Sequence, residues 1–404
     1  MKKLFLITLP LLFIFSAQAA EQNKYANTLT GDWSGKRTHL AENGIDIQPK
    51  YTLDSFAIVS GGIKTGTDML DEIDFTTRID GKKLWGIEGS SGKVYFYRNN
   101  FGHPNRDYVG SAQGIDGDES SHDFTHIDEA WLQQNFLENK YSVLAGLYDF
   151  TYEFYQTDSS GIFLNPTFNV GSEFSNSGGN GASIYASSAL AVRLKTQPTD
   201  NSYIQVAIMD GIPSIPYNPK RPNYQLYTKN GALILSEIGL TPTGGKFVIG
   251  AWTYTKGAPD LVTNQNRDSY GMYVTLEKQL YINPKNSNES LTGFFRIGKT
   301  DGNTTIFSYA WSGGINYAGL FPSREYGVFG LAALQAVNSN KYLQEELSEG
   351  INLKHRESGI ELTYQDYIIP GVLLQPDIQY IFNPSGNPAA KNALILGLRT
   401  EIFF

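Results

Sequence analysis

Apolar and polar residues alternate one by one through most of this chain, the pattern of β-strands that have one apolar and one polar face. In 392–404 the uncharged residues from Leu394 to Phe404 occupy every second position, whereas Arg399 and Glu401 lie on the other face. Segments of this kind number about sixteen. They span 45–59, 71–80, 92–101, 126–136, 140–148, 184–195, 202–210, 231–239, 246–255, 270–279, 290–299, 308–317, 326–336, 357–367, 372–382 and 392–404.

The connections between these segments alternate in length. Short connections follow even-numbered segments, at 137–139, 197–200, 241–244 and 319–324, and long ones follow odd-numbered segments, at 102–125, 149–183, 211–230 and 337–356. Short periplasmic turns and long outer loops are typical of outer-membrane barrels. The connections 81–91 and 300–307 fit this rule less well. The sequence therefore predicts an all-β fold, a transmembrane antiparallel up-and-down β-barrel of about 16 strands over 45–404.

One helical pattern precedes the predicted barrel. Asp32 can cap a helix, Trp33, Arg37 and Leu40 share one of its faces, and Gly44 can end it. We therefore expect a short amphipathic helix within an N-terminal periplasmic segment, 20–44.

The first residues have the three parts of a secretory signal peptide. The basic start Met1-Lys2-Lys3 leads into an apolar stretch from Leu4 to Phe15, and Ala17-Gln18-Ala19 supplies the small-x-small cleavage pattern. Cleavage after Ala19 would remove 1–19, and Ala20 is the alternative cleavage position. No run of about 18 apolar residues follows, so no transmembrane helix is predicted.

The composition suits a membrane barrel and excludes other classes. The chain has 25 tyrosines, 23 phenylalanines and 41 glycines, as expected for aromatic girdles and tight bends. A formal net charge of -8 argues against nucleic-acid binding, which requires a basic surface. The absence of cysteine excludes a disulfide scaffold and a lipoprotein anchor.

Several motifs resemble the carbohydrate-selective porin family, the OprB type. The strongest is LTGDWSGKRTHLAENGIDI at 29–47. The others follow in the family's order: EAWLQQNF at 129–136, LAGLYD at 144–149, FLNPTF at 163–168, MDGIP at 209–213 and PDIQYIFNP at 376–384. The resemblance implies a sixteen-stranded barrel in the outer membrane of a Gram-negative bacterium. It also implies a polar lumen through which monosaccharides or short oligosaccharides diffuse passively into the periplasm.

The alternation also assigns side chains to the lumen of the predicted barrel. Ile73 and Phe75 would face lipid, for example, which leaves Asp74 inside. The candidates for lining the pore and contacting sugar are Asp74, Arg78, Glu129, Trp131, Gln133, Arg193, Arg296, Glu361, Gln365, Asp377 and Arg399. Inner-wall charges also pair across strands in any water-filled barrel, so each has a structural alternative. Trp131 is the preferred contact, because an aromatic side chain directed into water needs a reason.

The long segment 149–183 contains more aromatic residues than a solvated loop would. We expect it to fold into the barrel mouth and narrow it. The constriction candidates are Tyr155, Phe163, Asn165 and Phe168. A loop that caps the rim or contacts a neighbouring subunit would also bury these side chains.

No catalytic, cofactor or metal site is predicted. The segment 116–127 begins like a calcium loop, but Ser121 replaces the required glycine and Ile127 replaces the bidentate glutamate. On a strand, His122 and His126 would lie about 13 Å apart. There is no GxSxG motif.

Other functions stay open at this point. Arg78, Arg193, Arg296 and Arg399 could form the basic ring of a general or anion-preferring porin. An enzyme barrel would need an outward-facing Ser–His pair, and a soluble lectin would not partition into detergent. The expected partners are small sugars, outer-membrane lipids and lipopolysaccharide, and barrel-assembly machinery that reads a terminal aromatic residue such as Phe404; nucleic acid is not expected. The chain could act as a monomer or a homotrimer.

Overall fold

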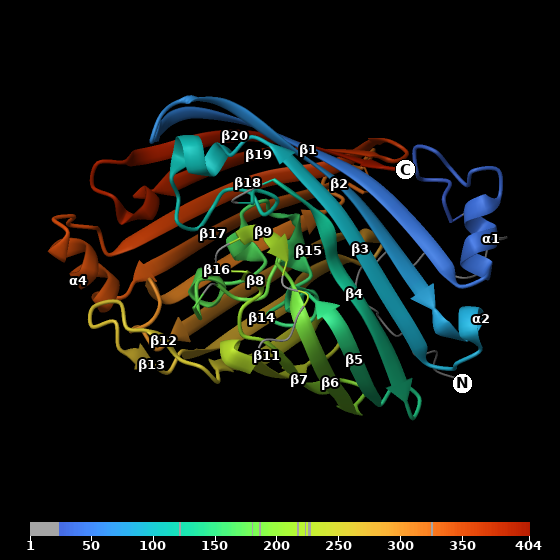
Figure 1. The fold of residues 1–404 in the computed structure, drawn as a ribbon. Helices are drawn as coiled ribbons and strands as arrows, with labels where there is room; N and C mark the ends of the chain where they lie inside the picture. Colours follow the sequence, from blue (N-terminus) through green and yellow to red (C-terminus); the bar gives the residue numbers. More distant parts are fainter. Residues whose placement is uncertain are drawn as a thin grey trace.

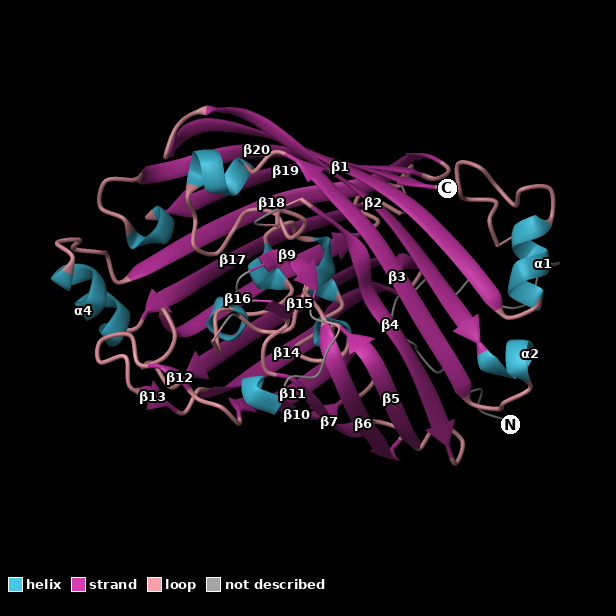
Figure 2. Ribbon diagram, viewed as in Figure 1, coloured by secondary structure: helices cyan, strands magenta, loops and turns pink. Residues whose placement is uncertain are grey.

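In the computed structural model the described residues are 24–404, except 121–122, 180, 186, 216–217, 223, 225–227 and 325. The expected signal peptide, 1–19, lies outside them. Sixteen antiparallel strands close into one barrel, with β20 hydrogen-bonded back to β1 (Figure 1, Figure 2). The strands are β1 (Ile45–Gly62), β2 (Gly66–Asp80), β3 (Ser90–Phe101), β4 (Phe124–Phe136), β5 (Tyr141–Tyr148), β6 (Ala189–Thr199), β7 (Ser202–Asp210), β10 (Ala232–Leu240), β11 (Gly245–Tyr254), β14 (Tyr270–Asn283), β15 (Asn286–Thr300), β16 (Phe307–Ala318), β17 (Val328–Asn338), β18 (Arg356–Ile369), β19 (Val372–Phe382) and β20 (Lys391–Phe403). The predicted fold class is confirmed.

The remaining elements are short and lie in the connections. Two hairpins pair β8 (Ser214–Ile215) with β9 (Asn218–Pro222) and β12 (Ala258–Pro259) with β13 (Asn266–Arg267). The α-helices are α1 (Lys36–Glu42), α2 (Gly81–Trp85), α3 (Ser172–Ser175) and α4 (Asn340–Ser348). Single helical turns cover Asn105–Val109, Phe150–Tyr152, Ser159–Ile162, Pro166–Phe168, Thr228–Asn230 and Pro384–Gly386. The short N-terminal helix is therefore confirmed as α1.

The two ends of the barrel differ in the length of their connections. Helices α1 and α2 and the C-terminus lie at one end, and α4 and the β12–β13 hairpin lie at the other (Figure 1). The first end has tight turns such as 200–201 and 370–371, and the second carries the long connections 102–123, 149–188 and 211–231. The first end is thus the periplasmic one. The connection 81–89, which fitted the length rule poorly, contains α2 at this end.

One strand begins later than the sequence pattern predicts. We expected a strand from 184, but β6 starts at Ala189. The backbone N–H of Ser187 bonds the carbonyl of Ile184, which forms a turn there, and the N–H of Ser188 bonds the side chain of Asp128. The outer loop after β5 therefore runs to residue 188.

The outer wall presents the apolar face of each strand, as the alternation predicts. Leu132, Val192 and Leu194 are about half exposed, at 57%, 48% and 54%. Their neighbours Glu129 and Arg193 point inward and are each 1% exposed. No helix among the described residues is long and apolar enough to cross a membrane.

The segment before β1 closes the periplasmic end of the seam between β1 and β20. The guanidinium of Arg37 is 3% exposed, and it donates to the main-chain oxygens of Phe404 at 2.6 Å and Ile47 at 2.7 Å. It also lies 3.9 Å from the centroid of the Tyr25 ring. Asp32 holds α1 in place, because its carboxylate accepts from the N–H and hydroxyl of Thr38, both at 2.8 Å.

The buried core of the molecule lies inside the barrel. Its largest cluster packs aromatic residues of the 149–188 loop, among them Phe150, Phe154 and Phe174, against Trp252 and Tyr273 of the wall. The Phe174 ring stacks on Trp252 with 4.1 Å between centroids. The long outer loop therefore fills part of the lumen.

Candidate functional site: a loop-narrowed polar channel

The 149–188 loop leaves β5 and is fixed to the inner wall of the barrel by wall side chains. Glu237 on β10 is 1% exposed and accepts four hydrogen bonds. One comes from the backbone N–H of Tyr155 at 2.9 Å, and two come from the hydroxyls of Tyr203 and Tyr273 at 2.5 and 2.6 Å. Tyr155 has a positive φ of 61°, a conformation that costs free energy in a non-glycine residue and that these contacts hold.

Two further wall residues hold the same loop. Glu361 on β18 accepts from the backbone N–H groups of Leu164 at 2.5 Å and Asn165 at 3.1 Å. Arg296 on β15 is 2% exposed and donates to three loop carbonyls. These are the carbonyls of Tyr155 at 3.2 Å, Asn169 at 2.7 Å and Thr167 at 2.9 Å. Hydrogen bonds of this kind satisfy loop backbone groups that would otherwise need water.

The four constriction candidates lie in this inward-folded segment, and all are buried. Tyr155 stacks on Tyr273 with 3.9 Å between ring centroids. Phe163 and Phe168 pack together 4.7 Å apart, and the side-chain amide of Asn165 donates to the carbonyl of Gly114 at 2.8 Å. They form the body of the obstruction rather than its water-facing surface, and their part in setting the channel width stays a prediction.

A second loop, 102–123, also enters the lumen, which we did not expect. It meets the wall at Arg399 on β20, whose guanidinium donates to Asp54 of β1 at 2.7 and 2.8 Å. The same group reaches Asp116 at 2.9 Å and Asp118 at 2.7 Å in the loop. Segment 116–127, considered above as an incomplete calcium loop, therefore begins with two aspartates paired with an arginine.

Beside the 149–188 loop, lysines paired with acids line the strands from β20 through β6. We call this set the polar wall: Lys50, Asp74, Lys93, Glu129, Trp131, Lys195, Arg399 and Glu401. Lys50 pairs with Glu401 at 3.1 Å and Asp74 at 3.5 Å, and Lys93 pairs with Glu129. The lysine side chains point into the barrel yet keep 27%, 13% and 25% of their surface exposed at Lys50, Lys93 and Lys195. They therefore face water inside the lumen.

The loop contributes one aromatic side chain to this water-facing surface. Tyr152 is 55% exposed, although the residues beside it, Phe150 and Phe154, are fully buried. Lys93 lies 3.8 Å from its ring centroid. Trp131 stands nearby on β4, half-buried, and its indole N–H donates to Glu129 at 3.1 Å. Two aromatic rings, Tyr152 and Trp131, therefore lie close to a hydrogen-bond donor, Lys93, and to a hydrogen-bond acceptor, Glu129.

Two acids of the loop differ in their ionisation. Burial raises the pKa of Glu173 to about 7. The hydroxyl of Tyr155 donates to this carboxyl group at 2.8 Å and offsets part of that rise. Burial also opposes ionisation of Glu153, but Lys195 and Arg193 outweigh it and lower the pKa of that carboxyl. Glu153 therefore carries charge at neutral pH beside the polar wall, while Glu173 titrates near neutrality.

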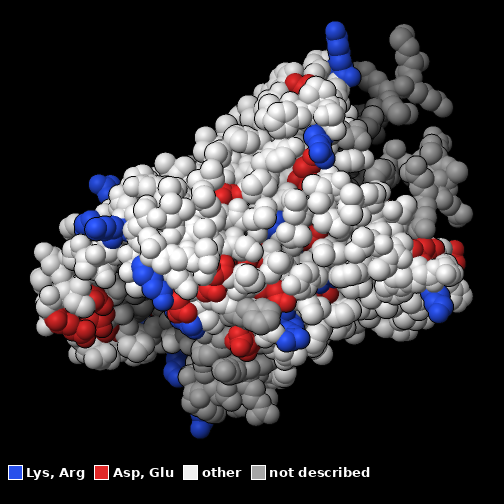
Figure 3. Space-filling model, turned by 90° about the horizontal axis from the view of Figure 1, so that it is seen from above, with Lys and Arg blue, Asp and Glu red and all other residues white. Residues whose placement is uncertain are grey.

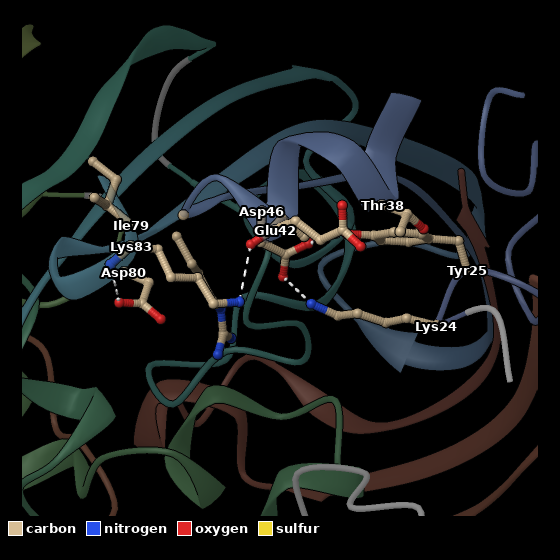
Figure 4. Close-up of a pocket in the computed structure, with 11 residues that line it drawn as sticks. Lys24, Tyr25, Thr38, Glu42, Asp46, Ile79, Asp80 and Lys83 are labelled. Carbon is tan, nitrogen blue, oxygen red and sulfur yellow. Dashed lines mark hydrogen bonds and ion pairs between the residues drawn. The ribbon is translucent and has the colours of Figure 1, made fainter. Parts of the chain in front are cut away.

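The remaining predicted residues occupy different parts of the lumen. Gln133 accepts from Arg193 at 2.6 Å, Asp377 is 2% exposed and accepts from Gln379 at 3.0 Å, and Gln365 is half-buried. Arg78 lies apart from them at the periplasmic end. It lines a cavity of about 360 Å³ in which Lys24 and Asp46 form an ion pair at 2.7 Å (Figure 4).

The structure does not bring the four arginines together as a basic ring. Arg193 is paired with Glu153 at 2.7 Å, and Arg399 is held by three aspartates. Arg296 is buried under the loop, and Arg78 lies at the periplasmic cavity. Their positive charges are thus separated and, at Arg193 and Arg399, compensated.

Sequence reasoning did not assign Lys50 and Lys93 to the lumen, and it did not choose Tyr152 or Asp118 as site residues. The alternation does place Lys50 on the same face as Thr52 and Asp54, so a complete facing assignment of the first strand would have found it. Tyr152 stands among the aromatic residues of the loop, and nothing in its neighbours distinguishes the one exposed ring from the buried ones.

Comparison with known proteins agrees with this geometry. The sequence model of the family described as carbohydrate-selective porin, OprB family, matches residues 64–404. Porin B of Pseudomonas aeruginosa is 23% identical over 434 residues, covering 96% of this chain and 94% of that protein. The putative porin QuiX of Acinetobacter baylyi is 20% identical and covers 93% of both chains.

A solved structure has the same fold. The high-pH structure of Pseudomonas putida OprB superposes with a TM-score of 0.84 at 20% identity, covering 94% of this chain and 98% of that chain. Fold and family together indicate a channel rather than an enzyme. The chain therefore belongs to the OprB family of carbohydrate-selective porins, β-barrel proteins of the Gram-negative outer membrane.

Proposed function

We propose that this channel passes small neutral sugars by passive diffusion, and that the sugar contacts the polar wall and Tyr152 on its way. The observation that carries the proposal is the pairing of water-facing lysines with carboxylates beside an exposed aromatic ring. A sugar hydroxyl both donates and accepts, so an ammonium and a carboxylate side by side can replace its water. The apolar face of a sugar ring can stack on Tyr152.

The same pairing argues against preference for anions. An anion-selective constriction needs uncompensated positive charge at its narrowest ring. Here Lys50, Lys93 and Lys195 each have a carboxylate within 4 Å. The general or anion-preferring porin therefore stays the second candidate, with no specific contact in its favour.

Within the proposal, the predicted residues divide into two roles. Asp74, Glu129, Trp131 and Arg399 are the candidates for direct contact, since they belong to the polar wall. Arg193, Arg296 and Glu361 are nearly fully buried and hold the 149–188 loop. Asp377 is also buried and accepts from Gln379, whose amide donates to the carbonyl of Ile115 in the 102–123 loop. Tyr155, Phe163, Asn165 and Phe168 narrow the passage by filling the lumen beside it.

The proposal is tested by recording ion current through the purified protein in a planar bilayer. Glucose and maltodextrins are titrated against lactate and phosphate. We expect saturable block by a sugar, and Trp131→Ala should weaken it. The matched control is Trp311→Ala, because Trp311 packs on Phe295 at the outer wall and should leave the block unchanged. Current that is indifferent to every sugar, or blocked more strongly by lactate or phosphate, would overturn the proposal.

A further inference from the structure

Three carboxylates meet inside the barrel where the 102–123 loop contacts the wall. Asp54 belongs to β1, and Asp116 and Asp118 belong to the loop. One oxygen can be chosen from each so that all three lie within 4.8 Å of one another. The side chains of Asp54 and Asp116 are 1% and 0% exposed, whereas that of Asp118 is 21% exposed. We call these three residues the aspartate cluster, and it opens to water at Asp118.

The aspartate cluster is reached from the lumen and not from the lipid. Alternate residues of β1 from Thr52 to Ile58 are buried toward the inside of the barrel, and Asp54 is one of them. Figure 3 views the side on which β1, β2 and β20 lie in Figure 1, and on this outer surface isolated charged groups interrupt a largely uncharged face. A hydrated cation that enters the channel can therefore approach the cluster without crossing lipid.

The aspartate cluster carries more negative charge than its own chain compensates. Among the described residues, Arg399 is the one base that pairs with it, and the guanidinium donates to the three carboxylates at 2.7–2.9 Å. Lys50 is paired with Asp74 and Glu401 instead. Three carboxylates thus share one positive charge, and carboxylates that share a site resist ionising together unless further positive charge is present.

One buried oxygen of the cluster has no donor. Arg399 donates to Oδ1 of Asp116, but Oδ2 of the same side chain is shielded from solvent and has no hydrogen-bond partner among the residues that the structure describes. The Asp116 carboxyl group also lies within hydrogen-bonding reach of the Asp54 carboxyl group. Two carboxylates offer each other only lone pairs, so their close approach favours a proton or a metal ion between them.

Acceptors also outnumber donors beside the aspartate cluster. The side-chain amide of Gln379 on β19 donates to the carbonyl of Ile115, the residue before Asp116, at 2.7 Å. The oxygen of that amide, Oε1, is buried without a partner in the described part of the chain, and so is Oδ2 of Asp377 two residues away. The surroundings of the cluster therefore attract a cation rather than an anion.

Calcium suits this set of ligands. Ca²⁺ binds oxygen ligands at about 2.3–2.6 Å, so ligands on opposite sides of the ion are about 5 Å apart, and the spread of 4.8 Å fits one such ion. Mg²⁺ binds at about 2.0–2.1 Å and keeps several waters, for which the buried side chains of Asp54 and Asp116 leave little room. The two positive charges of Ca²⁺ and the one of Arg399 equal the three negative charges of the aspartates.

We propose that the aspartate cluster binds one Ca²⁺ ion, which fastens the 102–123 loop to β1. Oδ2 of Asp116 supplies one ligand, Asp54 and Asp118 supply the others, and water completes the coordination at the exposed side of Asp118. The segment 116–127 lacks the glycine and the glutamate of a calcium loop, and the barrel wall supplies the ligand that the loop does not. Because the ligands lie on both the wall and the loop, removal of the ion should loosen the loop.

The test measures calcium binding by isothermal titration calorimetry to residues 20–404, refolded in detergent and freed of metal with a chelator. Refolded protein contains no lipopolysaccharide, whose phosphates also bind calcium. We expect one Ca²⁺ per chain with half-saturation at about 0.1–1 mM, as in extracellular calcium modules. Asp118→Asn keeps an acceptor for Arg399 but removes one ligand charge, and it should weaken binding by about tenfold or more. Asp107 lies in the same loop and pairs with Arg106 at the surface, so Asp107→Asn is the matched control and should bind like the wild type.

Thermal unfolding gives an independent measurement. Calcium should raise the unfolding temperature of the wild type and of Asp107→Asn, and it should raise that of Asp118→Asn much less. The proposal is overturned if the wild type binds no calcium at about 10 mM, ten times the upper end of the expected range. Undiminished binding by Asp118→Asn would also overturn it. So would an unfolding temperature that rises on acidification but not with calcium, because that result assigns a shared proton to Asp54 and Asp116. Far-ultraviolet circular dichroism verifies that each variant is folded.

Discussion

The ammonium nitrogen of Lys93 lies 3.8 Å from the centroid of the Tyr152 ring, and this contact joins the barrel wall to the loop that crosses the lumen. The same ammonium pairs with Glu129. A cation over an aromatic face attracts it without covering its far side. Because Tyr152 keeps 55% of its surface exposed, its ring is both fixed in position and open to a passing solute.

Replacing Tyr152 by alanine should weaken sugar block. Stacking of a ring on an aromatic face is worth about 0.5–1.5 kcal/mol, so the half-blocking sugar concentration should rise roughly two- to tenfold. Tyr152→Phe retains the ring and is the matched control. Titration of single-channel current with glucose measures both variants; equal block in wild type and Tyr152→Ala would exclude a stacking role.

Replacing Glu361 by glutamine should release part of the loop. The side-chain oxygens of Glu361 accept from two backbone N–H groups, and the residue is 1% exposed. Glutamine keeps only one acceptor oxygen, so the change costs about 1–3 kcal/mol at that anchor. We expect larger and noisier single-channel conductance at unchanged bilayer insertion. The matched control is Asp366→Asn on the same strand. Asp366 pairs with Arg324 and not with the loop, so this variant should conduct like the wild type.

Arg37→Lys should lower thermal stability without changing conductance. Lysine keeps the charge but cannot serve the main-chain oxygens of Phe404 and Ile47 in the same geometry. We expect a loss of about 2–4 kcal/mol, read as a lower unfolding temperature by circular dichroism. Lys36→Ala changes the exposed neighbour and should leave that temperature unmoved. An unchanged Arg37→Lys protein would mean that the seam does not depend on this contact.

The buried position of Glu173 makes the stability of the folded protein depend on pH, and the environment of the carboxyl group determines the direction. Burial raises its pKa from 4.5 to about 7, so the folded protein holds this proton more tightly than the unfolded chain does. Stability attributable to Glu173 is therefore full below pH 4.5 and is lost as the pH rises through 7.

Glu173→Gln should consequently raise the unfolding temperature at pH 8.5 and leave it unchanged at pH 4.5. The gain at alkaline pH should reach about 3 kcal/mol. Glu153→Gln serves as the contrast, because the pKa of Glu153 is lowered by Lys195 and Arg193, and its loss should destabilise at pH 8.5. Parallel temperature shifts for both variants at alkaline pH would contradict the assignment.

The strands could be predicted from sequence because the membrane enforces a strict period of two. Leu132 and Val192 must face lipid, so the residues between such positions must face inward. Aromatic density likewise indicated the inward fold of the loop that contains Phe154 and Phe174, since water is a poor environment for so many rings.

Partners across the lumen could not be predicted in this way. The alternation of the strand places Arg399 inside the barrel. Its contact with Asp116, however, depends on a loop more than 280 positions away in the chain, and that loop has too few aromatic residues to indicate that it folds inward. The pairing of Lys93 with Tyr152 similarly joins a strand to a loop residue whose direction is set by packing of its neighbours. Periodicity decides which face a side chain occupies, and only tertiary packing decides what it meets there.

The 149–188 loop also has a mechanical consequence. It starts at β5 and its Phe163 ring packs against Gly330 and Ala332 of β17, the strand eight places further round the sixteen-stranded wall. Arg296 and Glu361 fasten it on either side of that point. A hollow cylinder under lateral pressure flattens most readily across its diameter, and a tie along that diameter resists flattening. We therefore expect the loop to stiffen the barrel against flattening, so that the width of the passage beside it changes little with membrane tension.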